Sequence, residues 1–150
     1  MKVGQLLDFV NSGGNVVVVA NSEISEPFRD FSIEFSIDFD DQNTHVVDPF
    51  HRQDSSIVVD QWIPNEYVIS GKVNPILYRG LAHKFSGKNP LVFPLMTGYP
   101  STYSYSMSDS TGTIEGNPLL GQDVGLISLF QGRNNARVAF CGSTDMFSDE

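Results

Sequence analysis

The first twenty residues contain two hydrophobic patterns of different period. Apolar side chains recur at positions i, i+3, i+4 and i+7, which gives one helical face to Val3, Leu6, Leu7 and Val10. Gly13 and Gly14 follow, and glycines that can adopt positive φ are typical of a helix end. Residues 16–19 are all valine, and an unbroken β-branched run is typical of a strand covered on both faces in a parallel sheet. The pattern predicts a helix, a tight turn and a buried strand.

This order of elements bears on the class of fold. A doubly wound α/β sheet normally begins with a strand, whereas here a helix leads into the first strand. We therefore expect an α/β domain that lacks an earlier strand, so that the chain is a fragment. A length of 150 residues with 40% hydrophobic positions suffices for one core but is too short for two domains. We expect residues 1–150 to form a single domain within a larger α/β region.

The pattern then changes from helical to extended. Ser25, Glu26 and Pro27 supply an N-cap, an acid at the positive end of the helix dipole and a proline in the first turn. Aromatic residues follow on one face of this predicted helix, at Phe28, Phe31 and Phe35. Short extended segments separated by Gly, Pro, Asn and Asp come next, at residues 37–39, 44–47, 56–60, 67–70, 76–78, 91–96 and 102–106.

The last third of the chain begins with a polar segment. Residues 108–121 are rich in Gly, Ser, Thr and Asp and predict an exposed loop, with a binding loop as the alternative. Residues 124–130 and 137–141 then predict two strands, joined by the polar turn 132–136. The sequence therefore predicts a hairpin close to its end.

Charge narrows the classes of partner. Nine Lys and Arg residues against 18 Asp and Glu give a net charge of −9, which repels phosphate backbones and anionic headgroups. We expect no nucleic-acid partner. No apolar run approaches the roughly 18 residues that cross a bilayer, and we expect no direct membrane insertion by these residues.

Cys141 is the one candidate nucleophile. As the only cysteine it forms no intrachain disulfide, and it lies at the end of a predicted buried strand, a position that holds the nucleophile in some α/β enzymes. A catalytic thiol needs a base nearby, and the sequence places none of His45, His51 or His83 beside it. The surrounding FCGST also lacks the Gly-x-Cys-x-Gly elbow. A small core residue is the favoured interpretation.

Acidic and glycine-rich segments are weak candidates for a metal or cofactor site. A hard-metal or carboxylate site could be formed by Asp38, Asp40 and Asp41 with Asp48, His51 and Asp54 downstream, but a solvated acidic edge is the favoured interpretation. Counted from Asp38 as a calcium loop, the sixth position is Asn43 instead of Gly and the twelfth is Pro49 instead of Glu. Gly13 and Gly14 precede a strand, whereas dinucleotide loops follow one. The segment 142–144 has the right polarity to hold an anion, but its simpler role is to begin the next helix. We expect no catalytic residue, no metal and no cofactor.

Two polar clusters are candidates for binding a partner. Donors suited to carboxylates or carbonyls gather at the predicted turn, on Arg133, Asn134, Asn135 and Arg137, with salt bridges that fix the turn as the alternative. Three tyrosines spaced by Ser and Thr could form a contact face for protein or carbohydrate, namely Tyr99, Tyr103 and Tyr105. Alternation along a half-buried strand explains the last two equally well.

Four segments together resemble one family: FVNSGGNVVVVA, VNPILYRGLAH, NPLVFPLMTGYPSTYSYS and GRNNARVAFCGSTDMFSDE. They resemble the non-catalytic, single-span DDOST-type subunit of the eukaryotic oligosaccharyltransferase complex, which N-glycosylates proteins. The resemblance spans nearly all 150 residues in order. Its most specific parts are residues 74–80 and 133–137 together with Gly142 and Ser143.

The resemblance implies a lumenal domain of the endoplasmic reticulum with a flavodoxin-like or class I glutamine-amidotransferase-like, three-layer α/β core. We expect this core to be incomplete here and to carry extra β-strands in its middle. In the family, other oligosaccharyltransferase subunits are the partners and one of them catalyses, while this subunit supports assembly and stability. The family chain also carries a signal peptide, further β structure and one C-terminal membrane helix. The alternatives are an amidotransferase-like hydrolase that uses Cys141 and a carbohydrate-binding module.

Overall fold

The fold is described from a computed structural model, which covers residues 2–65, 68–69, 71, 73–85, 87, 89–106 and 118–148. The predicted strand 67–70 falls outside them at both of its ends, and most of the predicted loop 108–121 also lies outside. None of the helices in the described part is long and apolar enough to cross a membrane.

Both predicted helices are present, as α1 (Val3–Asn11) and α2 (Glu26–Ile33). The chain leaves α1 through Gly13, whose φ of 96° is a left-handed conformation that favours glycine. Gly14 lies under the ring of Phe9, and a Cβ at this position would come within 2.3 Å of the ring. The two glycines therefore end the helix, as predicted.

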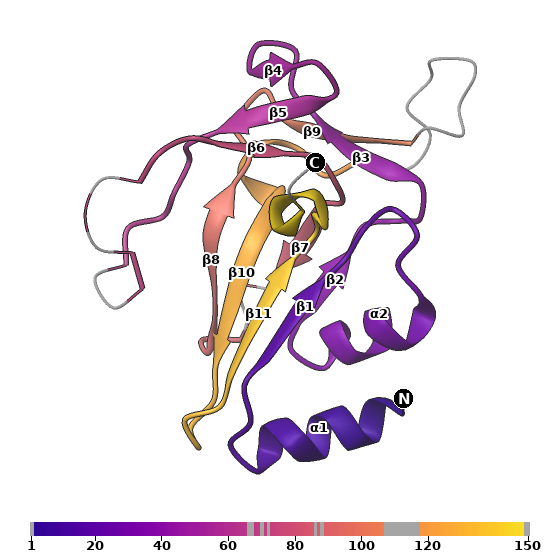
Figure 1. Cartoon of the computed structure of the whole chain (residues 1–150), viewed down its shortest axis with the longest axis vertical. Helices are drawn as coiled ribbons and strands as arrows, with labels where there is room; N and C mark the ends of the chain where they lie inside the picture. Colours follow the sequence, from indigo (N-terminus) through magenta and orange to yellow (C-terminus); the bar gives the residue numbers. More distant parts are fainter. Residues whose placement is uncertain are drawn as a thin grey trace.

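A mixed six-stranded sheet forms the centre of the molecule (Figure 1). Its strands are β1 (Val16–Val19), β2 (Ile37–Phe39), β7 (His83–Phe85), β8 (Val92–Thr97), β10 (Gly125–Gln131) and β11 (Arg137–Cys141). They are ordered β1-β11-β10-β7-β2, and β8 also pairs with β10. Strands β1 and β11 run parallel, and the other pairs are antiparallel. The assignment to a flavodoxin-like or amidotransferase-like core stays a prediction.

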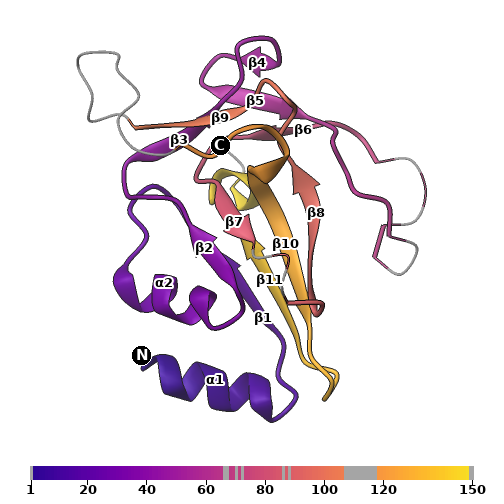
Figure 2. The ribbon, with the colours of Figure 1, turned by 180° about the vertical axis from the view of Figure 1, so that it is seen from behind.

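One expectation for β1 is wrong. The strand does pair in parallel, with Val16 opposite Val138 and Val18 opposite Phe140. However, it is not covered on both faces, because the side chain of Val17 is 63% exposed while that of Val18 is 4% exposed. The reason is that β1 is the end strand of the sheet and that α1 and α2 lie on one side of it (Figure 1, Figure 2).

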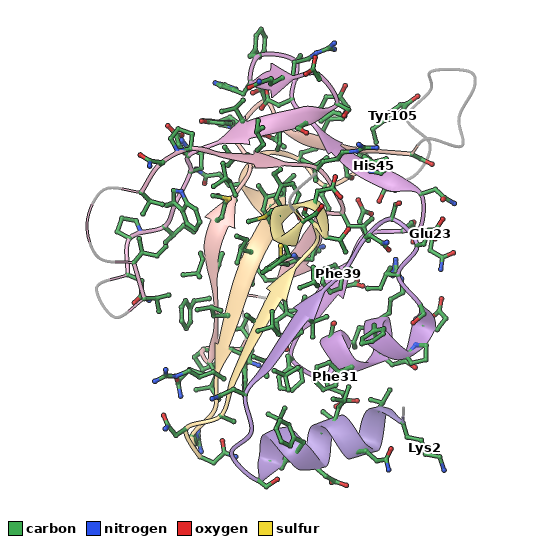
Figure 3. All side chains as sticks on the ribbon, in the orientation of Figure 1. Lys2, Glu23, Phe31, Phe39, His45 and Tyr105 are labelled. Atoms are coloured by element: carbon green, nitrogen blue, oxygen red, sulfur yellow. The ribbon has the colours of Figure 1, made fainter. Side chains whose placement is uncertain are left out.

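The middle of the chain forms two small sheets beyond one end of the main sheet (Figure 1). One contains β3 (Thr44–Val47) and β9 (Tyr103–Ser106), and the other contains β4 (Arg52–Gln53), β5 (Ser56–Val59) and β6 (Ile76–Tyr78). Figure 3 shows His45 on β3 near Tyr105 on β9, its partner in register. Strands β3, β5, β6 and β9 match predicted extended segments, whereas β4, like β7 of the main sheet, was not predicted. Two short 3-10 helices complete the described chain, η1 (Gly121–Asp123) and η2 (Asp145–Phe147).

Two hydrophobic clusters hold these layers together. The first lies between the helices and the main sheet, where the ring of Phe35 is 5.0 Å from Phe31, 4.8 Å from Phe130 and 5.7 Å from Phe140. The second lies between the main sheet and the small sheets and includes Tyr78, which is fully buried. The first cluster fixes the hairpin of β10 and β11 against the helices, and the hairpin carries the candidate site.

Candidate partner-binding surface

The predicted polar turn is the tip of the hairpin between β10 and β11. The backbone N–H of Gly132 donates to the carbonyl of Ala136 at 2.7 Å, and Asn135 adopts a left-handed φ of 68°. Arg133, Asn135 and Arg137 are exposed. We refer to these three residues as the hairpin surface.

Asn134 is exposed as well, but its side-chain amide bonds within the molecule. Its Nδ2 donates to the carbonyls of Val10 at 2.9 Å and Asn11 at 2.8 Å, and its Oδ1 accepts from the backbone N–H of Ala136 at 3.1 Å. The carbonyls at the end of a helix lack intrahelical partners, so Asn134 caps α1 and ties the turn to it. All three of these bonds are internal.

The two arginines of the hairpin surface differ in their contacts. Arg137 donates from Nε to Oε1 of Gln131 at 3.0 Å, and its backbone N–H donates to Oδ1 of Asn15 at 3.0 Å. The side chain of Arg133 makes no hydrogen bond or ion pair within the described part of the chain. Arg133 therefore has all of its donors available to a partner.

An apolar groove continues from Arg137 onto the face of the sheet opposite the helices. It has a volume of about 750 Å³. Its floor is a row of residues in register across four strands, namely Val17, Ala139, Leu129 and Phe93. Val68 also lines it, and among the described residues that line the groove none is acidic. We refer to it as the open groove.

The three tyrosines do not form one face. Tyr99 stacks on His51 with ring centroids 3.8 Å apart, and its hydroxyl donates to Asp60. Burial and this carboxylate raise the pKa of Tyr99. Tyr103 and Tyr105 flank a buried serine on β9, which confirms the alternation of a half-buried strand.

The loop that holds Tyr99 follows β8 at the end of the molecule opposite the hairpin tip (Figure 1). Tyr99 thus lies apart from the hairpin surface.

Asp48, one of the acidic residues weighed as a metal ligand, lies buried under this loop. Asp48 is 1% exposed and accepts hydrogen bonds from the hydroxyls of Ser101 and Thr102, each at 2.8 Å, and from the N–H groups of Phe50 and His51. Burial alone would raise its pKa, but the hydrogen bonds outweigh burial and lower it to about 2. An aspartate before a proline is a turn signal, and this is the feature that points to it.

Cys141 is part of the second hydrophobic cluster. It is 3% exposed, and its Sγ lies 3.6 Å from Sδ of Met146. Burial raises the pKa of the thiol, which opposes the thiolate form that a nucleophile needs. His83, whose pKa burial lowers to about 3, is bonded through Nε2 to Ser128 instead. No hydrogen bond joins Cys141 to a histidine in the described residues, and the thiol packs as a core residue.

The two most specific motifs of the sequence contact each other. The N–H of Leu81 donates to the carbonyl of Gly142 at 2.8 Å, and Ser143 Oγ donates to the carbonyl of Arg79 at 2.6 Å. A Cβ on Gly142 would lie 2.0 Å from the Leu81 carbonyl oxygen, and a Cβ on Gly80 would lie 2.0 Å from the Gly142 carbonyl oxygen. The glycine after Cys141 therefore permits close backbone packing.

Metal ligation finds no support in the described part of the chain. No three His, Cys, Asp or Glu side chains come together there in a way that could hold a metal ion. Asp48 pairs with one histidine, since its Oδ1 lies 3.2 Å from Nδ1 of His51. This pair, together with the hydrogen bonds from Ser101 and Thr102, holds the loop after β3 against the loop after β8.

A solved structure shares this fold. The mmIFT52 N-terminal domain has a TM-score of 0.65 to the chain, covering 98% of this chain and 61% of that one at 14% identity. This likeness concerns the fold alone.

Sequence matches cover the whole chain. The family described as OST48, N-terminal domain, matches residues 1–150. The chain is 35% identical over 97% of its length to the dolichyl-diphosphooligosaccharide–protein glycosyltransferase subunit wbp1 of Schizosaccharomyces pombe. It is 36% identical over 99% of its length to the dolichyl-diphosphooligosaccharide–protein glycosyltransferase 48 kDa subunit of Danio rerio. These matches cover 34% and 35% of the relatives, so the chain spans about a third of their length. The chain therefore belongs to the OST48 N-terminal domain family.

Proposed function

We propose that this domain is a non-catalytic, structural part of an oligosaccharyltransferase subunit, which supports assembly and stability of the complex for protein N-glycosylation. The observation that carries the proposal is the family match over residues 1–150, with relatives named as subunits of a dolichyl-diphosphooligosaccharide–protein glycosyltransferase. The domain functions on the lumenal side of the endoplasmic reticulum, and a membrane helix elsewhere in the polypeptide anchors it.

The chemistry of the described side chains supports a structural role. The thiol of Cys141 is buried with a raised pKa, and the imidazole of His83 is buried with a lowered one. Nucleophilic and general-base catalysis need an accessible nucleophile within hydrogen-bond reach of a base. Neither group meets that condition. The polar groups of the hairpin instead suit recognition of another protein.

The other subunits of the complex are the partners in this proposal, and the hairpin surface is where we place one contact. Arg133, Asn135 and Arg137 present exposed donors in a chain of net charge −9. Guanidinium groups bind carboxylates and carbonyls through paired hydrogen bonds. The hairpin surface therefore suits an acidic or carbonyl-rich segment of a neighbouring subunit. Asn134 supports it indirectly by fixing the turn, whereas Tyr99 fixes a distant loop and has no part in this surface.

The test is co-purification from cells in which the full-length subunit carries Arg133→Glu together with Arg137→Glu. We expect recovery of the other subunits to fall about tenfold, equivalent to ~1.4 kcal/mol. The matched control reverses two exposed charges elsewhere, Arg52→Glu on β4 and Lys84→Glu on β7. We expect the control to co-purify like the natural protein.

The two parts of the proposal fail separately. Equal recovery for the double variant and its control removes the hairpin surface as a contact but leaves the assignment to the complex. If cells depleted of the full-length protein retain normal amounts of assembled complex and normal N-glycosylation, the structural function itself is contradicted.

A further inference from the structure

Strand β1 leaves one edge of the main sheet open. It is the end strand, and no other strand in the described part of the chain pairs with its outer edge. Its sequence is Val16–Val19, without a charge, a proline or a bulge. Natural edge strands are usually protected by one of these features, because an apolar open edge invites pairing with another strand. The absence of protection indicates that this edge is normally paired.

The backbone of β1 identifies which groups await a partner. Ala20, directly after the strand, donates its N–H to the carbonyl of Cys141 at 2.8 Å. Backbone groups of alternate residues point to opposite edges of a strand, so Val16 and Val18 also face β11. The N–H and C=O groups of Val17 and Val19 therefore face outward.

The open groove adjoins this edge and adds side-chain specificity. Val17 is 63% exposed and lines the groove. It is the first residue of a row that continues across the neighbouring strands through Ala139, Leu129 and Phe93. The helices cover the opposite face, with Val18 in their cluster. The one charged residue that lines the groove among the described residues is Arg137. The groove therefore suits an apolar segment and would attract an acid next to it.

We propose that the outer edge of β1 and the open groove receive an extended, mainly apolar β-strand from the same polypeptide, supplied by the part of the family's length that these residues do not span. The matched region is 34% and 35% of the relatives' lengths, which leaves ample chain for such a strand. A tethered strand acts at an effective concentration on the order of millimolar and covers an aggregation-prone edge as the domain folds. A strand from a separate subunit would leave that edge open until assembly. The proposal rests on family membership and shares only Arg137 with the hairpin surface.

Photo-crosslinking in the full-length protein within its assembled complex identifies the occupant. A benzophenone amino acid replaces Val17, and the control carries the same group at Phe50, which is 79% exposed and remote from β1 in sequence. We expect the Val17 probe to crosslink to a peptide of the same polypeptide that lies outside the 150 residues, without a shift to higher mass. Crosslinks to another subunit, to a second copy, or no more product than the Phe50 control would each overturn the proposal.

Hydrogen exchange provides a second measurement that needs no variant. In the full-length protein we expect the amides of Val17 and Val19 to exchange as slowly as that of Val18, since all three would then be bonded within a sheet. Val18 is the internal control, because β11 protects it in either case. Fast exchange at Val17 and Val19 with slow exchange at Val18 would show the edge to be unpaired and contradict the proposal.

Discussion

At the scale of single residues, the buried carboxylate of Asp48 has the clearest energetic role. It accepts hydrogen bonds from two hydroxyls and two backbone amides and also pairs with the His51 ring, and these contacts join the loop after β3 to the loop after β8. A charged acceptor bonded by several groups is stabilised relative to its protonated form. Asp48 therefore stabilises the small sheets in its ionised state.

This role predicts a pH-dependent stability. The folded pKa of Asp48 is about 2, below its ordinary value of 3.8, so its contribution is complete above about pH 4 and is lost as the pH falls toward 2. Asp48→Asn should lower the free energy of unfolding by about 2 kcal/mol at pH 7 and by progressively less in acid. Urea denaturation of both proteins at several pH values measures this. If Asp48→Asn lowered the free energy of unfolding by the same amount at pH 7 and pH 2, the stabilising role of the ionised Asp48 carboxylate would be contradicted.

At the scale of elements, the end of β11 is joined to the segment after β6 by backbone packing. Gly142 lies against the Leu81 carbonyl and the Tyr78 hydroxyl, which itself donates to Leu81 at 2.6 Å. Neither neighbour is a flexible side-chain end that could move aside. The two segments can approach this closely only because glycine has no Cβ.

We therefore expect Gly142→Ala to lower the free energy of unfolding by about 3 kcal/mol or more, because the added methyl overlaps buried backbone. Gly4→Ala is the matched control, since a Cβ there has no neighbour within 4 Å and the residue lies inside α1. It should raise stability by roughly 0.5–1 kcal/mol. Thermal denaturation measures the stability of both variants. Equal melting temperatures for Gly142→Ala and Gly4→Ala would contradict close backbone packing at Gly142.

At the scale of the whole molecule, periodicity predicted the elements better than their surroundings. The spacing from Val3 to Val10 specified α1, because the side chains of one helical face pack on a core. The aromatic face predicted for the second helix is only partly correct, since Phe31 is buried while Phe28 is 41% exposed and Phe35 lies beyond the end of α2. The valine run specified a strand but not its coverage, since apolar side chains on both faces do not reveal what covers each face. The open edge of β1 was visible only in the sheet order.

At the candidate site, too, the sequence predicted the local structure but not the contacts between distant segments. The composition of the turn predicted a hairpin with exposed arginines, and the described chain has one. The role of Asn134 depends on carbonyls 124 and 123 residues away in sequence, and no local pattern reports such a contact. The raised pKa of Cys141 likewise follows from packing against distant segments.

We propose that the domain supports assembly of the complex and takes no part in the chemistry of glycosylation. The most direct measurement is the rate of N-glycosylation per assembled complex in cells whose full-length subunit carries Gly142→Ala. We predict that the amount of assembled complex falls while the rate per remaining complex is unchanged. A normal amount of complex with a reduced rate per complex would contradict the account.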